Sequence, residues 1–249
     1  DPVTWTVDDN GKADFDNIQD AIDTSSDGDE IVVAPGTYNN GGDQVVDTLG
    51  KAIWLHSSGG SEVTFINAQY FHRGIVCVSG EGPKTRIEGF TVMNAYTEEG
   101  GAGAYILGSS PTIIDCTFEG NYSYSGSGGG MGNYDNSSPT LTNCTFTGNT
   151  APTGGGMYLH SQSSPTLTNC TFTGNTATNG GGGQGRASRR RGAARALRSG
   201  LEPRPRSRNN QRRRRCCRAH RKRAARRSSD RCRRSPDRCR RHRSLPYRG

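Results

Sequence analysis

The feature that most constrains this chain is a stretch that recurs word for word. SSPTLTNCTFTGNTA occupies residues 137–151 and again residues 163–177, and a looser copy, SSPTIIDCTFEGN, occupies residues 109–121. A recurring stretch of this length is one supersecondary unit, which buries its apolar face only against its neighbours. The chain is therefore predicted to fold as a repeat protein.

Apolar and polar residues alternate within each unit. Cys144 and Phe146 share one side of the segment, and Thr145 and Thr147 share the other. A period of two is typical of a β-strand, and β-branched threonines favour one. The single proline of the unit, Pro139, falls just before the strand, where its missing N–H breaks no ladder hydrogen bond. Each unit is thus predicted to contain short strands.

Equivalent residues of successive units form files. Ile87 is expected to continue them upstream, with Phe65 beside it 22 residues earlier, and Ile31, Ile53 and Ile75 are expected to form a further file with the same step. The step lengthens in the later units, as expected where insertions fall in turns. The clearest files are Cys116, Cys144, Cys170 and Phe118, Phe146, Phe172.

Asparagines and glycines close each unit. Asn149 and Asn175, followed by glycine runs at residues 154–156 and 180–183, are expected to supply left-handed or tight turn conformations. Short strands joined by such turns describe one coil of a parallel β-helix. A leucine-rich repeat would show a helix with a 3.6-residue period, and a propeller blade needs about 40 residues. The predicted fold class is therefore an all-β parallel β-helix, or solenoid.

One helix is predicted near the start of the chain, at residues 14–23. Asp16 is placed as its N-cap, and Ile18, Ala21 and Ile22 form an apolar stripe. A β-helix leaves the edge of its first strand unpaired, and a short amphipathic helix can cover that end. We interpret this helix as an N-terminal cap.

The formal net charge of +9 averages two unlike segments. Residues 1–184 are acidic and are predicted to form the β-helix with its cap, whereas residues 185–249 are rich in arginine. The second segment has almost no apolar periodicity, so it is predicted to be a disordered basic tail that could bind nucleic acid or another polyanion. No apolar run in the chain is long enough to span a bilayer.

A second interpretation of the tail stays open. It begins at a glycine run, in the middle of a coil, and glycine codons read one base out of frame give alanine and arginine. The tail is therefore either a shifted reading frame or a genuine basic segment. No metal site is assigned to its cysteines in either case.

Three stretches resemble a known family: DFDNIQDAIDTSSDGDEIVVAPGTY, GEGPKTRIEGFTV and the SSPTLTNCTF units. They are similar to right-handed parallel β-helix proteins of the pectin-lyase-like superfamily. The pairing of FxxN with GGG and a following Met131 or Met157 resembles the repeat of polymorphic outer-membrane proteins. The resemblance covers about residues 3–183 and implies a right-handed β-helix. It does not imply one function, since this scaffold carries lyases, hydrolases, adhesins and passenger domains.

Enzymes of that family would show calcium-binding carboxylates with a basic residue, or a close set of aspartates, because a cation must neutralise the uronate while a base removes a proton. The repeats hold only Asp115, Glu119 and Asp135 as acidic residues, so no catalytic set is carried over. The remaining candidate is an anionic-sugar subsite that the 22-residue step would bring together, or, more simply, a group of solvated charges: His72, Arg73, Lys84, Arg86 and Glu88.

Other residue groups are weaker candidates. No cofactor is assigned, although calcium could bind the acidic turns formed by Asp8, Asp9, Asp27, Asp29 and Glu30, which lack a full oxygen-ligand loop. The file of Cys116, Cys144 and Cys170 is expected to be a reduced, buried ladder, because parallel Cβ vectors do not suit a disulfide. An aromatic strip for stacking a sugar ring, or else plain turn packing, is expected from Tyr122, Tyr124, Tyr134 and Tyr158.

Three functional hypotheses follow. The first is a secreted or cell-surface β-helix, associated with an outer membrane, that acts as a structural, adhesive or glycan-binding protein without catalysis. The second is a polysaccharide lyase or glycoside hydrolase, and the third is polyanion or nucleic-acid binding through the basic tail. An uncapped C-terminal strand edge would also favour edge-to-edge self-association.

Overall fold

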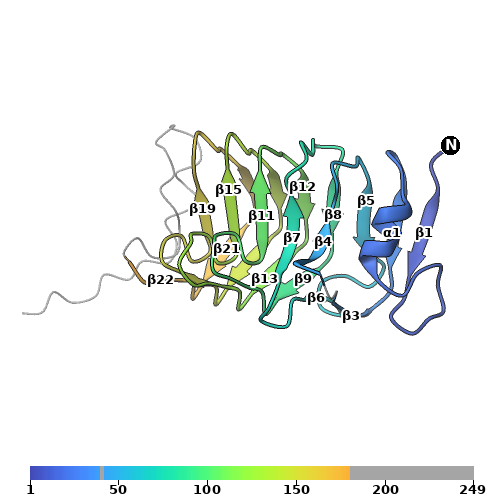
Figure 1. Cartoon of the computed structure of the whole chain (residues 1–249), viewed down its shortest axis with the longest axis horizontal. Helices are drawn as coiled ribbons and strands as arrows, with labels where there is room; N and C mark the ends of the chain where they lie inside the picture. The colour runs from blue at the N-terminus through green and yellow to red at the C-terminus, as the bar shows by residue number, and fades with distance from the viewer. Residues whose placement is uncertain (40–41, 180–249) are drawn as a thin grey trace, which may run out of the picture. The chain divides into compact units, whose positions relative to one another are not determined.

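A computed structural model of the chain describes residues 1–39 and 42–179. In these residues the chain winds through parallel sheets, and strands from successive coils lie side by side (Figure 1). The longest, sheet A, has seven strands, about one for each coil, so the predicted all-β parallel solenoid is confirmed. The basic tail proposed for residues 185–249 lies outside the described residues.

The strands of the two longer sheets come from each coil in turn. Sheet A contains β1 (Thr4–Val7), β2 (Glu30–Val33), β5 (Trp54–Ser57), β8 (Arg86–Glu88), β12 (Thr112–Ile114), β16 (Thr140–Thr142) and β20 (Thr166–Thr168). Sheet B contains β3 (Gly36–Tyr38), β6 (Thr64–Asn67), β9 (Thr91–Met93), β13 (Thr117–Glu119), β17 (Thr145–Thr147) and β21 (Thr171–Thr173).

Two further sheets close the coil. Sheet C contains β4 (Gln44–Asp47), β7 (Arg73–Cys77), β11 (Ala104–Leu107), β15 (Met131–Tyr134) and β19 (Met157–Leu159). Sheet D contains β10 (Tyr96–Thr97), β14 (Tyr122–Ser123), β18 (Thr150–Ala151) and β22 (Thr176–Ala177). All the pairings between these strands are parallel, which requires each coil to complete a full turn before its strands meet their equivalents.

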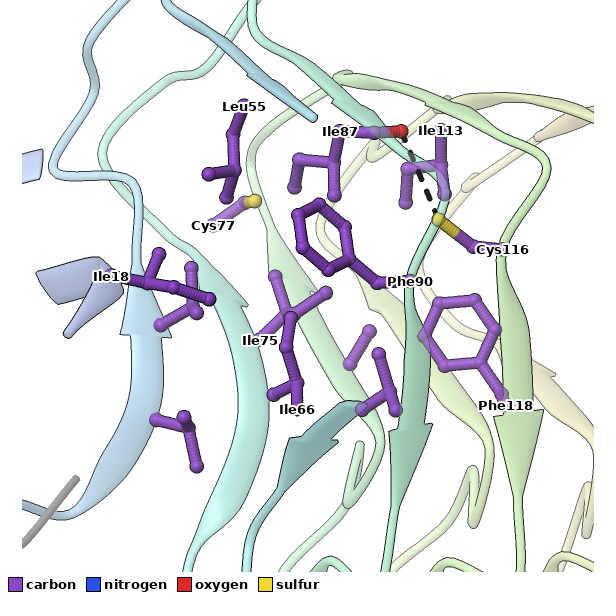
Figure 2. Packing of buried hydrophobic residues seen from close by; sticks show 14 of the residues in the cluster. Ile18, Leu55, Ile66, Ile75, Cys77, Ile87, Phe90, Ile113, Cys116 and Phe118 are labelled. Atoms are coloured by element: carbon purple, nitrogen blue, oxygen red, sulfur yellow. Dashed lines mark hydrogen bonds between the residues drawn. The ribbon is translucent and has the colours of Figure 1, made fainter. Parts of the chain in front are cut away.

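The core is a set of apolar files that run from coil to coil. Phe118, Phe146 and Phe172 stack with ring centroids 4.8 and 4.7 Å apart, as their spacing in the sequence predicted. Ile113 and Cys116 of the Phe118 coil, and Ile87 and Phe90 of the preceding coil, belong to the same buried cluster as Phe118 (Figure 2). The described cysteines are free. Cys116 and Cys144 are buried and Cys170 is half-buried, so the file points inward as expected, with its last member partly exposed.

The predicted register upstream of Ile87 is wrong. Ile87 lies opposite Leu55 in sheet A, a longer step along the chain than the predicted one, whereas Phe65 pairs with Thr91 in sheet B. Ile31 also pairs with Leu55, and Ile75 belongs to sheet C. The error has a physical cause: isoleucine, leucine and phenylalanine are interchangeable at inward positions, so an apolar file cannot reveal an insertion in an adjoining loop.

The N-terminal helix is shorter than predicted. α1 spans Ile18–Thr24, and its N-cap is Asn17, not Asp16, because the Asn17 side chain accepts a hydrogen bond from the Asp20 backbone N–H. Asn17 has extended backbone angles, so the helix begins at the residue after it. The predicted apolar stripe is buried: Ile18, Ala21 and Ile22.

α1 covers the first edge of sheet C, as its interpretation as a cap requires. It lies against β4 (Figure 1), the end strand of that sheet. The Gln19 amide occupies the place of a further strand: its Oε1 accepts from the Asp47 N–H at 2.8 Å, and its Nε2 donates to the Asp47 carbonyl at 3.1 Å. Lys51 Nζ then donates to the carbonyls that end the helix, those of Ile22, Asp23 and Ser25.

Carboxylate side chains cap the first strands of sheets A and B, which are β1 and β3. On β1, the Thr6 N–H donates to Asp14 Oδ2 at 2.9 Å. On β3, the Thr37 N–H donates to Asp9 Oδ2 at 3.0 Å. Each of these side chains accepts from a backbone group that a preceding strand would otherwise pair, so the start of the solenoid is closed by polar side chains as well as by the helix.

Asn149 and Asn175 do not supply the turn conformations predicted for them. The left-handed residues are the preceding glycines, Gly148 and Gly174, with φ of 62° and 65°. Asn149 instead points inward and is buried. Its Oδ1 accepts from the Asn121 N–H and Nδ2, and its own Nδ2 donates to the next asparagine, so the file is a buried amide ladder.

Candidate binding faces

Outward side chains of three successive coils meet on sheet A. On β5, Trp54 and His56 point outward on either side of the buried Leu55, as strand alternation requires. The register places Trp54 between Glu30 of β2 and Arg86 of β8, and His56 beside Glu88. We call Glu30, Trp54, His56, Arg86 and Glu88 the sheet A cluster.

The polar side chains of the sheet A cluster are bonded to one another. Arg86 Nη2 lies 2.6 Å from Glu88 Oε2, and the Arg86 guanidinium carbon lies 4.9 Å from the Trp54 ring centroid. Trp54 Nε1 donates to the same Glu88 oxygen at 3.2 Å. His56 Nε2 lies 3.0 Å from Glu30 Oε1, and its ring stacks on Trp54. The cluster thus holds a carboxylate-bound imidazole beside a carboxylate-bound guanidinium.

The five residues expected to form one subsite lie on two sheets. Arg86 and Glu88 belong to the sheet A cluster, and Lys84 lies exposed in the turn before β8. Arg73 is on β7 in sheet C, where it forms an ion pair of 2.8 Å with Glu99, and His72 directly precedes it. They were expected to meet because a 22-residue step was predicted to set Phe65 beside Ile87, and that register is wrong. A binding role for either group stays a prediction.

Sheet C carries a continuous row of neighbouring aromatic side chains that begins at an arginine. The guanidinium carbon of Arg73 lies 4.6 Å from the Tyr105 ring centroid, and Tyr105 lies 5.1 Å from Tyr134. Tyr158 follows at 5.8 Å from Tyr134, and His160 at 6.2 Å from Tyr158. We call these residues the sheet C row.

Packing accounts for the sheet C row. Tyr134 lies over Gly132, where a Cβ would come within 2.6 Å of the tyrosine Cε2. The Tyr134 hydroxyl donates to the Ser127 carbonyl at 2.8 Å, and burial raises the pKa of Tyr134 above the ordinary tyrosine value. A tyrosine held in this way is a structural element of the face and not a free platform for a ligand.

A more open aromatic group lies along sheet D. Tyr96 and Tyr122 are paired in register with ring centroids 5.8 Å apart, and Tyr124 lies 6.4 Å from Tyr122. The loop before β7 adjoins them, since the Tyr96 N–H donates to the His72 carbonyl. The exposed rings are Tyr70 at 60%, Phe71 at 79% and Tyr124 at 61%. We call these residues the sheet D strip: Tyr70, Phe71, His72, Tyr96, Tyr122 and Tyr124.

The expected strip of four tyrosines is therefore divided. Tyr122 and Tyr124 belong to the sheet D strip, and Tyr134 and Tyr158 belong to the sheet C row. Sequence reasoning missed Tyr70 and Phe71, because only the loop geometry reveals their exposure. It also missed Trp54 and His56 of the sheet A cluster, and considered Glu30 only as a calcium ligand, although their alternation with buried apolar residues was a usable signal.

The acidic residues considered as calcium ligands have protein partners. Asp29 accepts from the backbone N–H groups of Val3 and Ser26 and from Trp5 Nε1, and these hydrogen bonds hold its pKa below the ordinary value. Asp27 Oδ1 accepts from the Ala52 N–H. Within residues 1–39 and 42–179, no group of three or more His, Cys, Asp or Glu residues is placed to hold a metal ion.

Comparison with known proteins addresses the fold. A family model described as a right handed beta helix region matches residues 51–187, more than half of the chain. The chain belongs to this family. Membership agrees with the parallel sheets and assigns the right-handed sense to the β-helix. No curated protein and no solved structure matches the chain. No helix in the described part of this β-helix is long and apolar enough to cross a membrane.

Proposed function

We propose that this β-helix is a secreted or cell-surface protein that binds neutral glycans through the sheet D strip, without catalysis. The observation that carries the proposal is the set of exposed rings that successive coils place along one side of the solenoid. Sugar rings present C–H faces that pack on exposed aromatic rings, and a tyrosine hydroxyl can hydrogen-bond their hydroxyl groups. Repetition from coil to coil would let an extended glycan contact several rings.

The distribution of charge favours a neutral sugar over an acidic one. Arg73 is paired with Glu99, and Arg86 is paired with Glu88. Lys51 donates to the carbonyls at the end of α1. An anionic sugar would have to displace these internal partners to reach Arg73, Arg86 or Lys51, and each displacement costs the contact that is lost. A neutral glycan meets no such cost.

The test is binding of the full chain to neutral oligosaccharides of glucan, mannan and galactan, measured by isothermal titration calorimetry. Replacing Phe71 and Tyr124 by alanine should weaken binding about tenfold, since each stacked ring contributes about 0.5–1.5 kcal/mol. Both side chains are largely exposed, so the double variant should keep its stability. Tyr158→Ala in the sheet C row is the matched control and should bind as the parent chain does. Equal binding by the double variant and the parent would contradict the proposal.

A second function, acid–base cleavage of an acidic polysaccharide, has one specific observation in its favour. The contact of His56 with Glu30 orients an imidazole beside Arg86, so a base and a cation lie on the same face. Release of unsaturated uronate, followed by its ultraviolet absorbance with and without calcium, tests this function. Activity that is lost in His56→Ala and in Arg86→Ala, with neutral-glycan binding absent, would replace the first proposal by this one.

A further inference from the structure

The outward face of sheet A changes character along the solenoid. In β12, β16 and β20 the register aligns two outward files, Thr112, Thr140, Thr166 and Ile114, Thr142, Thr168, while Ile113, Leu141 and Leu167 face the core. Neighbouring strands lie about 4.8 Å apart, and alternate residues along a strand lie about 6.6 Å apart. The face is therefore a regular two-dimensional array of threonines with one isoleucine.

These threonine side chains are free to meet a partner. Within the described residues, the hydroxyls of Thr140, Thr142, Thr166 and Thr168 make no hydrogen bond to the protein, and only Thr112 Oγ1 is engaged, with the Pro83 carbonyl. A β-branched side chain on a strand is restricted in χ1, so the hydroxyl and the methyl group keep fixed positions. The array thus presents oxygens and methyl groups at constant spacing.

Charge is absent from this end of the sheet. Residues 137–179 contain no Asp, Glu, Lys or Arg, whereas the same sheet carries the sheet A cluster in the earlier coils. In these coils a charged partner such as nucleic acid or an acidic peptide has nothing to pair with. The first strand of the face, β12, borders Arg86 and Glu88 of β8, which are paired with each other. These outward positions also lack an aromatic ring on which a sugar could stack. The surface that fits a rigid, uncharged array of hydroxyl and methyl groups is one with its own short two-dimensional repeat of hydrogen-bonding oxygens.

We propose that this face, Thr112, Ile114, Thr140, Thr142, Thr166 and Thr168, binds the ordered water lattice at the surface of an ice crystal. The hydroxyls hydrogen-bond water oxygens, and the methyl groups between them fill the spaces of the lattice. The fixed side chains lose little conformational entropy on binding, which favours a weak contact repeated many times. The inference is independent of glycan binding, since it uses a different sheet.

The test is partition of the full chain into slowly growing ice, with inhibition of ice recrystallisation as a second readout. The parent chain should enter the ice fraction, whereas Thr142→Lys combined with Thr168→Lys should reduce its ice-bound share about tenfold, because both the lattice match and the hydrogen bonds are lost. Circular dichroism establishes that the variant is folded, since an outward lysine is tolerated on a strand surface.

The matched control uses sheet C, because sheet B presents similar outward threonines on β17 and β21. Tyr158→Lys combined with His160→Lys changes outward side chains at the same end of the solenoid and should leave ice partition unchanged. Partition of the parent no greater than that of an inert protein would overturn the proposal, as would equal loss in both double variants. Self-association that depends on Thr142 and Thr168, seen by sedimentation without ice partition, would assign the face to a second copy and overturn it as well.

Discussion

The two halves of this solenoid are stabilised in different ways. In the N-terminal coils, residues 3–39 and 42–108, individual polar side chains hold particular backbone groups, as Gln19 holds Asp47 and Asp14 holds Thr6. In the C-terminal coils, residues 109–179, the same side chain recurs at the same place in each coil, as in the stack of Phe118, Phe146 and Phe172. The first half depends on unique anchors and the second on ladders.

Glu81 illustrates the anchors. Its buried carboxylate accepts from Thr48 Oγ1 at 2.8 Å, from the Gly50 N–H at 2.9 Å, from the Ser79 N–H at 2.9 Å and from Ser109 Oγ at 2.7 Å. One side chain thus ties together turns from three coils. In a ladder, equivalent residues of successive coils share the stabilising contacts. We therefore expect substitutions of two ladder residues to have non-additive effects on stability, and a substitution of an anchor to act independently.

The largest effect is expected in the phenylalanine ladder. Phe146→Ala should lower the free energy of unfolding by about 3–5 kcal/mol, because it leaves a cavity and removes ring contacts on both sides. Denaturant titration of the full chain measures the change. Phe71→Ala, the same substitution at an exposed ring, should change stability by less than about 0.5 kcal/mol. A loss below about 1 kcal/mol for Phe146→Ala would show that the ladder is not the main support of these coils.

The amide ladder is expected to come next. Asn149→Ala removes the partner of the buried Asn121 N–H and Nδ2 and leaves the Phe118 carbonyl without its donor. Unsatisfied buried groups should lower the free energy of unfolding by about 2–3 kcal/mol. Thr147→Ala, at an outward position of the same coil, is the control and should be nearly neutral. A similar change in both variants would argue that water replaces the lost amide.

An anchor should show itself by its dependence on pH. Burial raises the pKa of Glu81, but the hydrogen bonds from Ser109, Thr48 and the backbone outweigh it and hold the pKa below the ordinary glutamate value. Its contribution is therefore complete above the unfolded-state pKa of about 4.3 and is lost as the pH falls through the folded-state pKa. Glu81→Gln should lower stability by about 2 kcal/mol at neutral pH.

The readout for Glu81 is the difference in stability between the parent chain and Glu81→Gln, measured by denaturant titration from pH 7 to about pH 3. This difference should shrink as the pH falls, while the carboxylates common to both proteins cancel. A difference that stays constant over the whole range would mean that the pKa of Glu81 is the same in the folded and the unfolded protein, so that its four donors do not favour the ionised carboxylate.

The smallest effect is expected at the N-terminal cap. Gln19→Ala removes two hydrogen bonds at the edge of β4 and should lower the free energy of unfolding by about 1 kcal/mol, since the site is only partly buried. Amide hydrogen exchange at Asp47 should quicken, and the Leu141 amide in β16 serves as an internal reference. Unchanged exchange at Asp47 would mean that α1 covers this edge without the help of Gln19.

Prediction from sequence succeeded where the repeats are nearly identical. The pairings of Phe118 with Phe146 and of Ile113 with Leu141 follow directly from aligned words in the sequence. Upstream, the register failed because inward isoleucine and leucine carry no positional label, so the long step from Leu55 to Ile87 stayed hidden. The subsite expected at Arg73 and Arg86 depended on that register. In the structure Arg73 lies on sheet C and Arg86 on sheet A.

For the candidate faces, too, the sequence predicts some features and only the tertiary structure reveals others. Alternation along a strand predicts which residues point outward, and so the outward threonines of β16 and β20 could be read from TLT. The sheet on which an outward residue lies depends on the length of every loop before it, and this placed Tyr122 and Tyr134 on different sheets. The exposure of Phe71 and the packing of Tyr134 over Gly132 likewise depend on the tertiary structure and could not be predicted from the sequence.

The sequence by itself determined the parallel β-helix, its N-terminal helical cap and the inward files of the last coils, because local alternation and exact repetition are properties of the chain. Only the tertiary structure decided the early register, the buried role of Asn149, and the meeting of Glu30, Trp54 and Arg86 on one face. The physical reason is that stacking energy depends on what lies one coil away, and that distance along the chain is set by loops whose sequences carry no periodic signal.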